Sequence, residues 1–192
     1  MKMSNIEKRF VNSPSHSRQV SSQAEKMLRL VDVSAGRKYL DVGCGNGAAP
    51  IHLARKYQLE VTGIDVDPDQ IELARQSSTG LANARFLSVS GTQMPFAEAE
   101  FDIVATNKVM HHIANWPAAV AEMIRVLKPD GVLIYGDFVY PGWLAAAGRV
   151  LVGDRAGFPT RQALELIFEQ HGLSVIHRSK SPLNYQAVLR KG

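Results

Sequence analysis

The chain lacks a second cysteine. Cys44 is the only one among the 192 residues, so an internal disulfide bond is excluded. It also lacks a run of roughly 18 apolar residues, the length that a membrane-spanning helix requires. Residues 1–10 carry charges and are not followed by an apolar stretch, which argues against a secretory signal. We therefore expect a protein of the cytoplasm that has no membrane partner.

A strong excess of one charge is missing as well. The 22 basic and 18 acidic residues give a net charge of +4, and the basic residues are not gathered into one block. Four basic residues near the C-terminus are Arg178, Lys180, Arg190 and Lys191. We interpret them as solvated strand ends rather than as a nucleic-acid surface, and we expect no nucleic-acid partner.

Length and composition predict a single domain over residues 1–192, because 45% of the residues are apolar and can form a sizeable core. Helical patterns alternate with strand-like segments at 38–42, 60–65, 85–89, 101–106, 132–136, 173–177 and 185–189. This alternation predicts an α/β fold with a parallel sheet that helices cover on both faces. A turn at 182–184 is compatible with a hairpin between the last two strands.

Two segments stand apart from this alternation. Residues 1–37 read as a cap segment whose helix continues through Val33, and residues 138–158 read as a short helical insertion. We interpret the apolar stretch 144–152 as a lid helix, with a membrane-facing helix as the alternative that Arg149 disfavours. Trp143 and Phe158 are expected to pack in the core or in the lid.

A glycine-rich turn follows the first predicted strand. Its spacing, Gly43-x-Gly45-x-Gly47, differs from the G-x-G-x-x-G of dinucleotide sites, so it suits a compact amino-acid group better than a pyrophosphate. The carboxylate of such a group can face the start of the following helix. The second predicted strand ends at Asp65, about twenty residues later, which is the usual distance for a carboxylate that binds a ribose.

Six segments occur in the order of one known family: 40–47 (LDVGCGNG), 63–65 (GID), 94–96 (MPF), 101–104 (FDIV), 111–112 (HH) and 126–131 (VLKPDG). Together they closely resemble the class I S-adenosylmethionine-dependent methyltransferases, in the branch that acts mostly on small molecules. The resemblance covers residues 39–134, about half of the chain. It implies a Rossmann-like, doubly wound, three-layer α/β/α fold with strand order 3-2-1-4-5-7-6 and strand seven antiparallel.

The resemblance implies S-adenosylmethionine as cofactor and S-adenosylhomocysteine as product. The backbone of Gly43 and Gly45 would clasp the methionine part, and Asp41 would order the turn. Cys44 lies in this turn, and we interpret it as a small packing residue rather than a nucleophile. The backbone carbonyl of Asn107 would face the cofactor's ammonium group.

The adenosine part of the cofactor is assigned in the same way. Asp65 would accept hydrogen bonds from both ribose hydroxyls, and Val66 would cover one face of the adenine. The other side would be bordered by Ser90, Gly91, Thr92 and Met94. Ser90 departs from the family, which often has an acid there, so adenine recognition is expected to be weaker.

Three side chains are candidate general bases for the acceptor: His111, His112 and Asp137. No acid or cysteine lies at ligand spacing from the two histidines, so we expect no metal site. Lys108 stands where the family is usually apolar. It could face the substrate, but the alternative of a packed stem with a solvated amine is favoured.

The sequence predicts an enzyme that transfers a methyl group in line to a small-molecule acceptor. The cap segment (residues 1–37) and the insertion (residues 138–158) are expected to exclude water from the site. Two other classes stay open: a non-catalytic S-adenosylmethionine-binding module and a nicotinamide-dependent oxidoreductase. The identity of the acceptor, the methylated atom and the oligomeric state, a homodimer included, are left open by the sequence.

Overall fold

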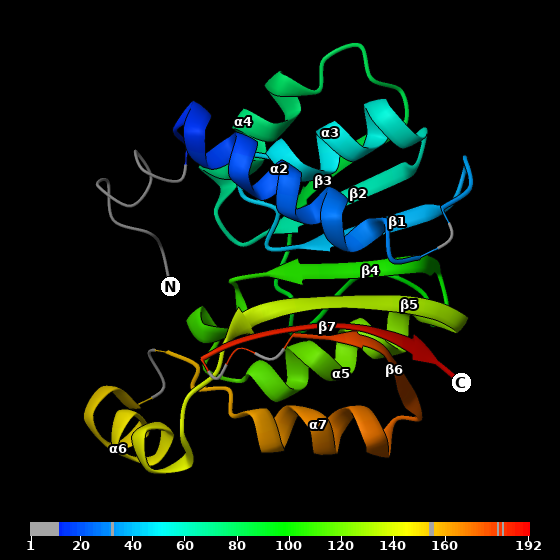
Figure 1. The fold of residues 1–192 in the computed structure, drawn as a ribbon. Helices are drawn as coiled ribbons and strands as arrows, with labels where there is room; N and C mark the ends of the chain where they lie inside the picture. Colours follow the sequence, from blue (N-terminus) through cyan, green and yellow to red (C-terminus); the bar gives the residue numbers. More distant parts are fainter. Residues whose placement is uncertain (1–11, 32, 154–155, 180, 182) are drawn as a thin grey trace. The chain divides into compact units, whose positions relative to one another are not determined.

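A computed structural model describes residues 12–31, 33–153, 156–179, 181 and 183–192. Seven strands form one sheet in the order β3-β2-β1-β4-β5-β7-β6 (Figure 1), which confirms the predicted strand order. The described residues divide into two compact units, an N-terminal unit that ends at Gly91 and a C-terminal unit that begins at Thr92. The expectation of a single domain stays a prediction.

Three parallel strands form the sheet of the N-terminal unit. They are β1 (Lys38–Val42), β2 (Glu60–Asp65) and β3 (Ala84–Ser88). Most residues of β1 and β2 are buried, as expected for strands covered on both faces. The first two strands have the predicted bounds, and β3 begins one residue earlier than predicted. Because the strands are parallel, their carboxyl ends lie along one edge.

The described residues of this unit also include three helices: α2 (Pro14–Leu28), α3 (Ala48–Tyr57) and α4 (Pro68–Ser77). Asp67 caps α4, because its carboxylate accepts from the Asp69 amide at 3.0 Å. The prediction that the first helix continues through Val33 is wrong. After Leu28, the amides of Leu30 and Val31 bond three residues back, which closes a tight turn instead.

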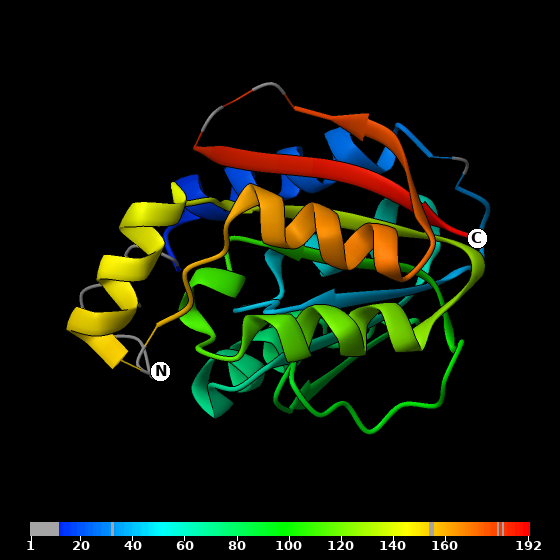
Figure 2. The same cartoon turned by 90° about the horizontal axis from the view of Figure 1, so that it is seen from below.

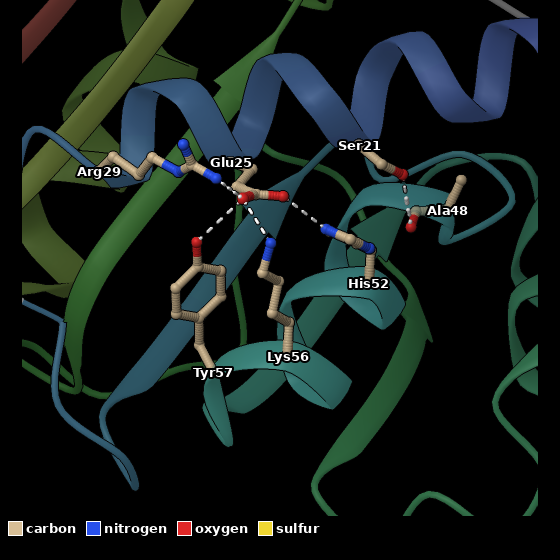
Figure 3. Close-up of polar contacts among 7 residues, drawn as sticks. All are labelled: Ser21, Glu25, Arg29, Ala48, His52, Lys56 and Tyr57. Atoms are coloured by element: carbon tan, nitrogen blue, oxygen red, sulfur yellow. Dashed lines mark hydrogen bonds and ion pairs between the residues drawn. The ribbon is translucent and has the colours of Figure 1, made fainter.

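A polar cluster joins α2 to α3, which lie side by side (Figure 3). The Glu25 carboxylate of α2 accepts from Lys56 Nζ at 2.6 Å and lies 2.9 Å from His52 Nε2. Arg29 and the Tyr57 hydroxyl donate to the same carboxylate. These partners hold the pKa of Glu25 well below its usual range, the Lys56 hydrogen bond having the largest effect. The cluster therefore stabilises the packing of the cap helix as long as Glu25 is ionised.

The C-terminal unit contains the other four strands, β4 (Phe101–Asn107), β5 (Leu127–Phe138), β6 (Leu173–Arg178) and β7 (Asn184–Lys191). Strand β5 is parallel to β4 and antiparallel to β7, which confirms the predicted reversal of the last strand. The strand β5 begins at Leu127, five residues before the predicted start at Val132. Residues 128–131 form an irregularity within this strand, with Asp130 at φ 60°.

Helices α5 (Trp116–Val126) and α7 (Arg161–Gln170) contact each other and pack on the strands of this unit (Figure 2). Thr160 caps α7 as its sequence suggests, accepting from the Ala163 amide at 3.2 Å. A short 3-10 helix, η1 (Met110–His112), follows β4.

The predicted insertion helix is present as α6 (Gly142–Val152). Gly148 packs against the Phe158 ring so closely that a Cβ there would lie 2.4 Å from a ring carbon. Trp143 is 75% exposed, so a core position for this residue is wrong. Its lid role stays a prediction, as does the membrane-facing alternative. Within the described residues, no helix is both long and apolar enough to span a lipid bilayer.

Some expectations fall on residues outside the described part of the chain. These are residues 1–11 and 32 of the cap segment, residues 154–155 of the insertion, Lys180 and Pro182.

Candidate active site

The glycine turn joins β1 to α3 within the N-terminal unit. Gly43, Gly45 and Gly47 all have positive φ, at 78°, 53° and 78°, a conformation that other residues rarely adopt. A Cβ on Gly47 would also lie 2.9 Å from the Cβ of Ala74. The tight turn brings the chain directly into α3, whose first amides point back toward it. An anionic group can bind at such a helix start.

Asp65 ties this turn to the end of β2. Its Oδ2 accepts from the Gly45 amide at 2.9 Å, and its Oδ1 accepts from the Asp67 amide at 2.9 Å. An ionised carboxylate has about four lone-pair positions, so these two bonds leave capacity for two hydroxyl donors. The carboxylate can therefore anchor the turn and still bind the hydroxyls of a ribose.

Asp41 lies at the end of β1 and is buried. Burial, and to a lesser degree the negative charge of Asp65, raise the pKa of Asp41 to about 7. The turn amides of Gly43 and Cys44 donate to the Ile64 carbonyl at 2.8 and 2.9 Å. Asp65 and the end of β2 thus hold the turn, and a role of Asp41 in ordering it stays a prediction.

Cys44 packs in a buried cluster with Ile51, Ile71, Ala74 and Phe86. Burial raises the pKa of its thiol well above the usual value, which disfavours the nucleophilic thiolate. This environment supports its interpretation as a packing residue.

Sequence reasoning missed Gln70, the third residue of α4. Its amide is fully buried, and neither side-chain polar atom has a hydrogen-bond partner among the described residues. Its Oε1 lies 3.8 Å from the position that a Cβ on Gly45 would occupy, so Gln70 packs beneath the glycine turn. No local signal could have found it, because a glutamine in a first helical turn usually indicates a surface residue.

The residues assigned to the adenine fall in both units. In the N-terminal unit, Val66 is 54% exposed directly after β2, and Ser90 and Gly91 follow β3. The C-terminal unit holds Thr92 and Met94 in the loop before β4. Their roles toward an adenine stay predictions.

The loop of Met94 is held by α5. The Met94 amide donates to Glu122 Oε2 at 2.9 Å, and Arg125 donates to the carbonyl of Met94 at 3.2 Å. Arg125 also binds Glu122, and this hydrogen bond is the main reason that the pKa of Glu122 is lowered. The ion pair with Arg125 therefore keeps Glu122, which accepts from the Met94 amide, ionised.

The C-terminal unit brings two of the three predicted bases together. His111 Nδ1 lies 2.6 Å from Oδ1 of Asp137, whose side chain is fully buried. The amides of His111 and Phe138 also donate to this carboxylate, at 3.2 and 2.7 Å. Because a carboxylate only accepts, Nδ1 carries the donated proton. This leaves Nε2 as the ring atom that can accept a proton.

His112 is the third candidate base, and Asn107 is a cofactor candidate of this unit. The His112 ring lies 3.9 Å from the His111 ring, centroid to centroid. Asn107 ends β4 opposite Gly136 of β5. Among the described residues, no group of three or more histidine, cysteine, aspartate or glutamate side chains is placed to hold a metal ion.

The sequence is similar to one family model and to curated relatives. A model of the methyltransferase domain family matches residues 40–135. The chain is 36% identical over 146 residues to methyltransferase GfsG of Streptomyces halstedii, covering 74% of this chain and 52% of that protein. It is 30% identical over 118 residues to 27-O-demethylrifamycin SV methyltransferase of Amycolatopsis mediterranei, covering 60% and 43%. The chain thus spans about half the length of these curated relatives.

Among solved structures, the fold is similar to that of a SAM-dependent methyltransferase from Aquifex aeolicus, with a TM-score of 0.74. The match covers 100% of both chains at 20% sequence identity, which supports the fold alone.

Proposed function

Because the chain belongs to the family of S-adenosylmethionine-dependent methyltransferases, we propose that it transfers a methyl group from this cofactor to a small-molecule acceptor with an ionisable hydroxyl. The observation that carries the proposal of a hydroxyl acceptor is the contact of 2.6 Å between His111 and the buried Asp137. The Amycolatopsis relative, whose name specifies a 27-O-demethylated substrate, supports an oxygen acceptor.

The residues of the N-terminal unit fit the parts of the cofactor. The start of α3 can receive its carboxylate, and Asp65 has free lone pairs for its ribose hydroxyls. Exposed Val66 can pack on the adenine. The cofactor supplies a methyl group already activated by a positive sulfur, so the protein needs no nucleophile of its own.

The mechanism therefore depends on orientation and on one proton transfer. Nε2 of His111 takes the proton of the acceptor hydroxyl, so that the oxygen's electron pair can attack the methyl carbon in line with the bond to sulfur. The electrons of the broken carbon–sulfur bond stay on the sulfur. Asp137 keeps Nδ1 protonated and stabilises the imidazolium that forms.

Turnover of S-adenosylmethionine with a panel of phenols and enols tests this proposal, with S-adenosylhomocysteine measured by mass spectrometry. We expect product only when an acceptor is present, and little product from His111→Ala. Tight binding of the cofactor without turnover would instead favour a non-catalytic binding module. Binding of NAD without binding of S-adenosylmethionine would favour an oxidoreductase. A cytoplasmic location and a homodimer stay predictions.

A further inference from the structure

Lys108 has an unusual backbone conformation at the carboxyl end of β4. Its φ is 57°, in the left-handed region, and its amide donates to the Gly136 carbonyl at 2.7 Å. Left-handed lysine is strained, and such strain persists where neighbouring hydrogen bonds enforce it, often at functional sites. The bond to β5 therefore imposes a direction on this side chain that an ordinary strand end would not.

The ammonium group of Lys108 and the ring of the proposed base, His111, lie near the same aromatic side chain, Phe138. The Nζ of Lys108 is 5.5 Å from the centre of the Phe138 ring, and the His111 ring packs edge-to-face against that same ring at 5.3 Å. Phe138 is 40% exposed, and the Lys108 side chain is half-buried. The base and the cation thus lie within 6 Å of one exposed aromatic ring.

The neighbour found for the Lys108 ammonium among the described residues is an aromatic ring. In the part of the chain that the structure describes, no carboxylate pairs with this ammonium. Of the buried acids, Asp137 is the nearest to Lys108 along the sequence, and its carboxylate already accepts from the His111 ring and from two amides. A half-buried cation that shares an aromatic neighbour with a proton acceptor attracts the negative charge that forms when a nearby hydroxyl loses its proton.

We propose that Lys108 binds an oxyanion of the acceptor and selects acceptors that carry a phenol, an enol or a carboxylate at this position. The inference rests on the proposed function. The acceptor hydroxyl gives its proton to His111 Nε2, and the negative charge left on oxygen lies beside the ammonium of Lys108. With a carboxylate acceptor, the same ammonium binds the charge that is already present.

Two small probes test the proposal on protein loaded with S-adenosylhomocysteine. Visible absorbance measures the ionised fraction of 4-nitrophenol at a fixed pH, and calorimetry measures the affinity for benzoate. We expect wild-type protein to raise the ionised fraction or to bind benzoate, and Lys108→Met to weaken this anion binding about tenfold. Lys108→Arg should retain most of it.

Lys128→Met is the matched control, because Lys128 is paired with Asp102 Oδ1 at 2.8 Å, near the other end of β5. It should behave as wild type, and the affinity for S-adenosylhomocysteine should be the same in all variants. A Lys108-dependent effect on 4-nitrophenol identifies a hydroxyl acceptor, and an effect on benzoate alone identifies a carboxylate acceptor; both support the proposal.

Equal anion binding by wild type and Lys108→Met would overturn the proposal, and so would a wild-type protein that affects neither probe. If wild-type protein does not bind S-adenosylhomocysteine at all, the proposed function itself fails. The two failures are therefore distinguishable.

Discussion

Replacing Asp65 with alanine should weaken the binding of S-adenosylhomocysteine by roughly 10- to 150-fold. The structure gives the reason, because one carboxylate holds the glycine turn through the Gly45 amide and would also bind the ribose. A hydrogen bond to a charged group contributes about 1.5–3 kcal/mol. Since about 1.4 kcal/mol corresponds to a tenfold change in affinity, the loss of the ribose contact alone accounts for this range.

The same substitution should also lower the stability of the ligand-free protein. Asp65→Ala removes the acceptor of the Gly45 and Asp67 amides, both at 2.9 Å. A net loss of about 1–3 kcal/mol lowers the Tm by roughly 2–4 °C per kcal/mol in a chain of this size. Asp65→Asn keeps one side-chain oxygen, so it should lie between wild type and the alanine variant in both measurements.

Isothermal titration calorimetry with S-adenosylhomocysteine measures the affinity without knowledge of the acceptor, and calorimetric melting measures the Tm. Asp69→Ala is a suitable control, because Asp69 is an exposed carboxylate four residues away in the first turn of α4. Its affinity should equal that of wild type. If Asp65→Ala melts earlier but binds with wild-type affinity, Asp65 has only a structural role and the ribose assignment is refuted.

Three further predictions concern ionised groups. The pKa of Asp41 is raised to about 7, so its ionisation opposes folding by at most about 4 kcal/mol. The free energy of unfolding should therefore fall as the pH rises from about 4 to about 7, and then level off. Asp41→Asn should flatten this decline in urea titrations, and parallel pH profiles would contradict the reasoning. Asp137→Asn should lower kcat about 10²- to 10⁴-fold, as measured by product release, because it removes the charge that orients His111; an unchanged kcat would exclude the dyad. Glu25→Gln should lower the Tm at neutral pH. The difference in Tm between wild type and variant should shrink as the pH falls below the usual carboxyl pKa. The reason is that Glu25, whose pKa is lowered in the folded protein, stabilises the fold only while its carboxylate is ionised. Glu165→Gln, which removes a more exposed ion pair with Arg178, should change the Tm less, and equal losses would show that the α2–α3 cluster has no special role.

Local features were predictable from the sequence. The strands at 38–42 and 60–65, the caps Asp67 and Thr160, and the glycine turn all depend on neighbouring residues, so their patterns are complete within a few positions. Element ends that depend on the rest of the fold were not predictable. The first helix stops at Leu28, and β5 begins at Leu127 because it pairs with Phe101 of β4.

The sequence by itself determined the family, because six short motifs occur in that family's order. The strand order and the candidate cofactor-binding residues followed from the resemblance to the family, and periodicity gave only the alternation of strands and helices. Only the tertiary structure decided which candidates meet. The β4–β5 pairing places His111 against Asp137, 26 positions away. It also brings the strained Lys108 to Phe138. Such contacts depend on the register between strands that are far apart in the sequence, because a shift of one residue would turn these side chains to the other face of the sheet.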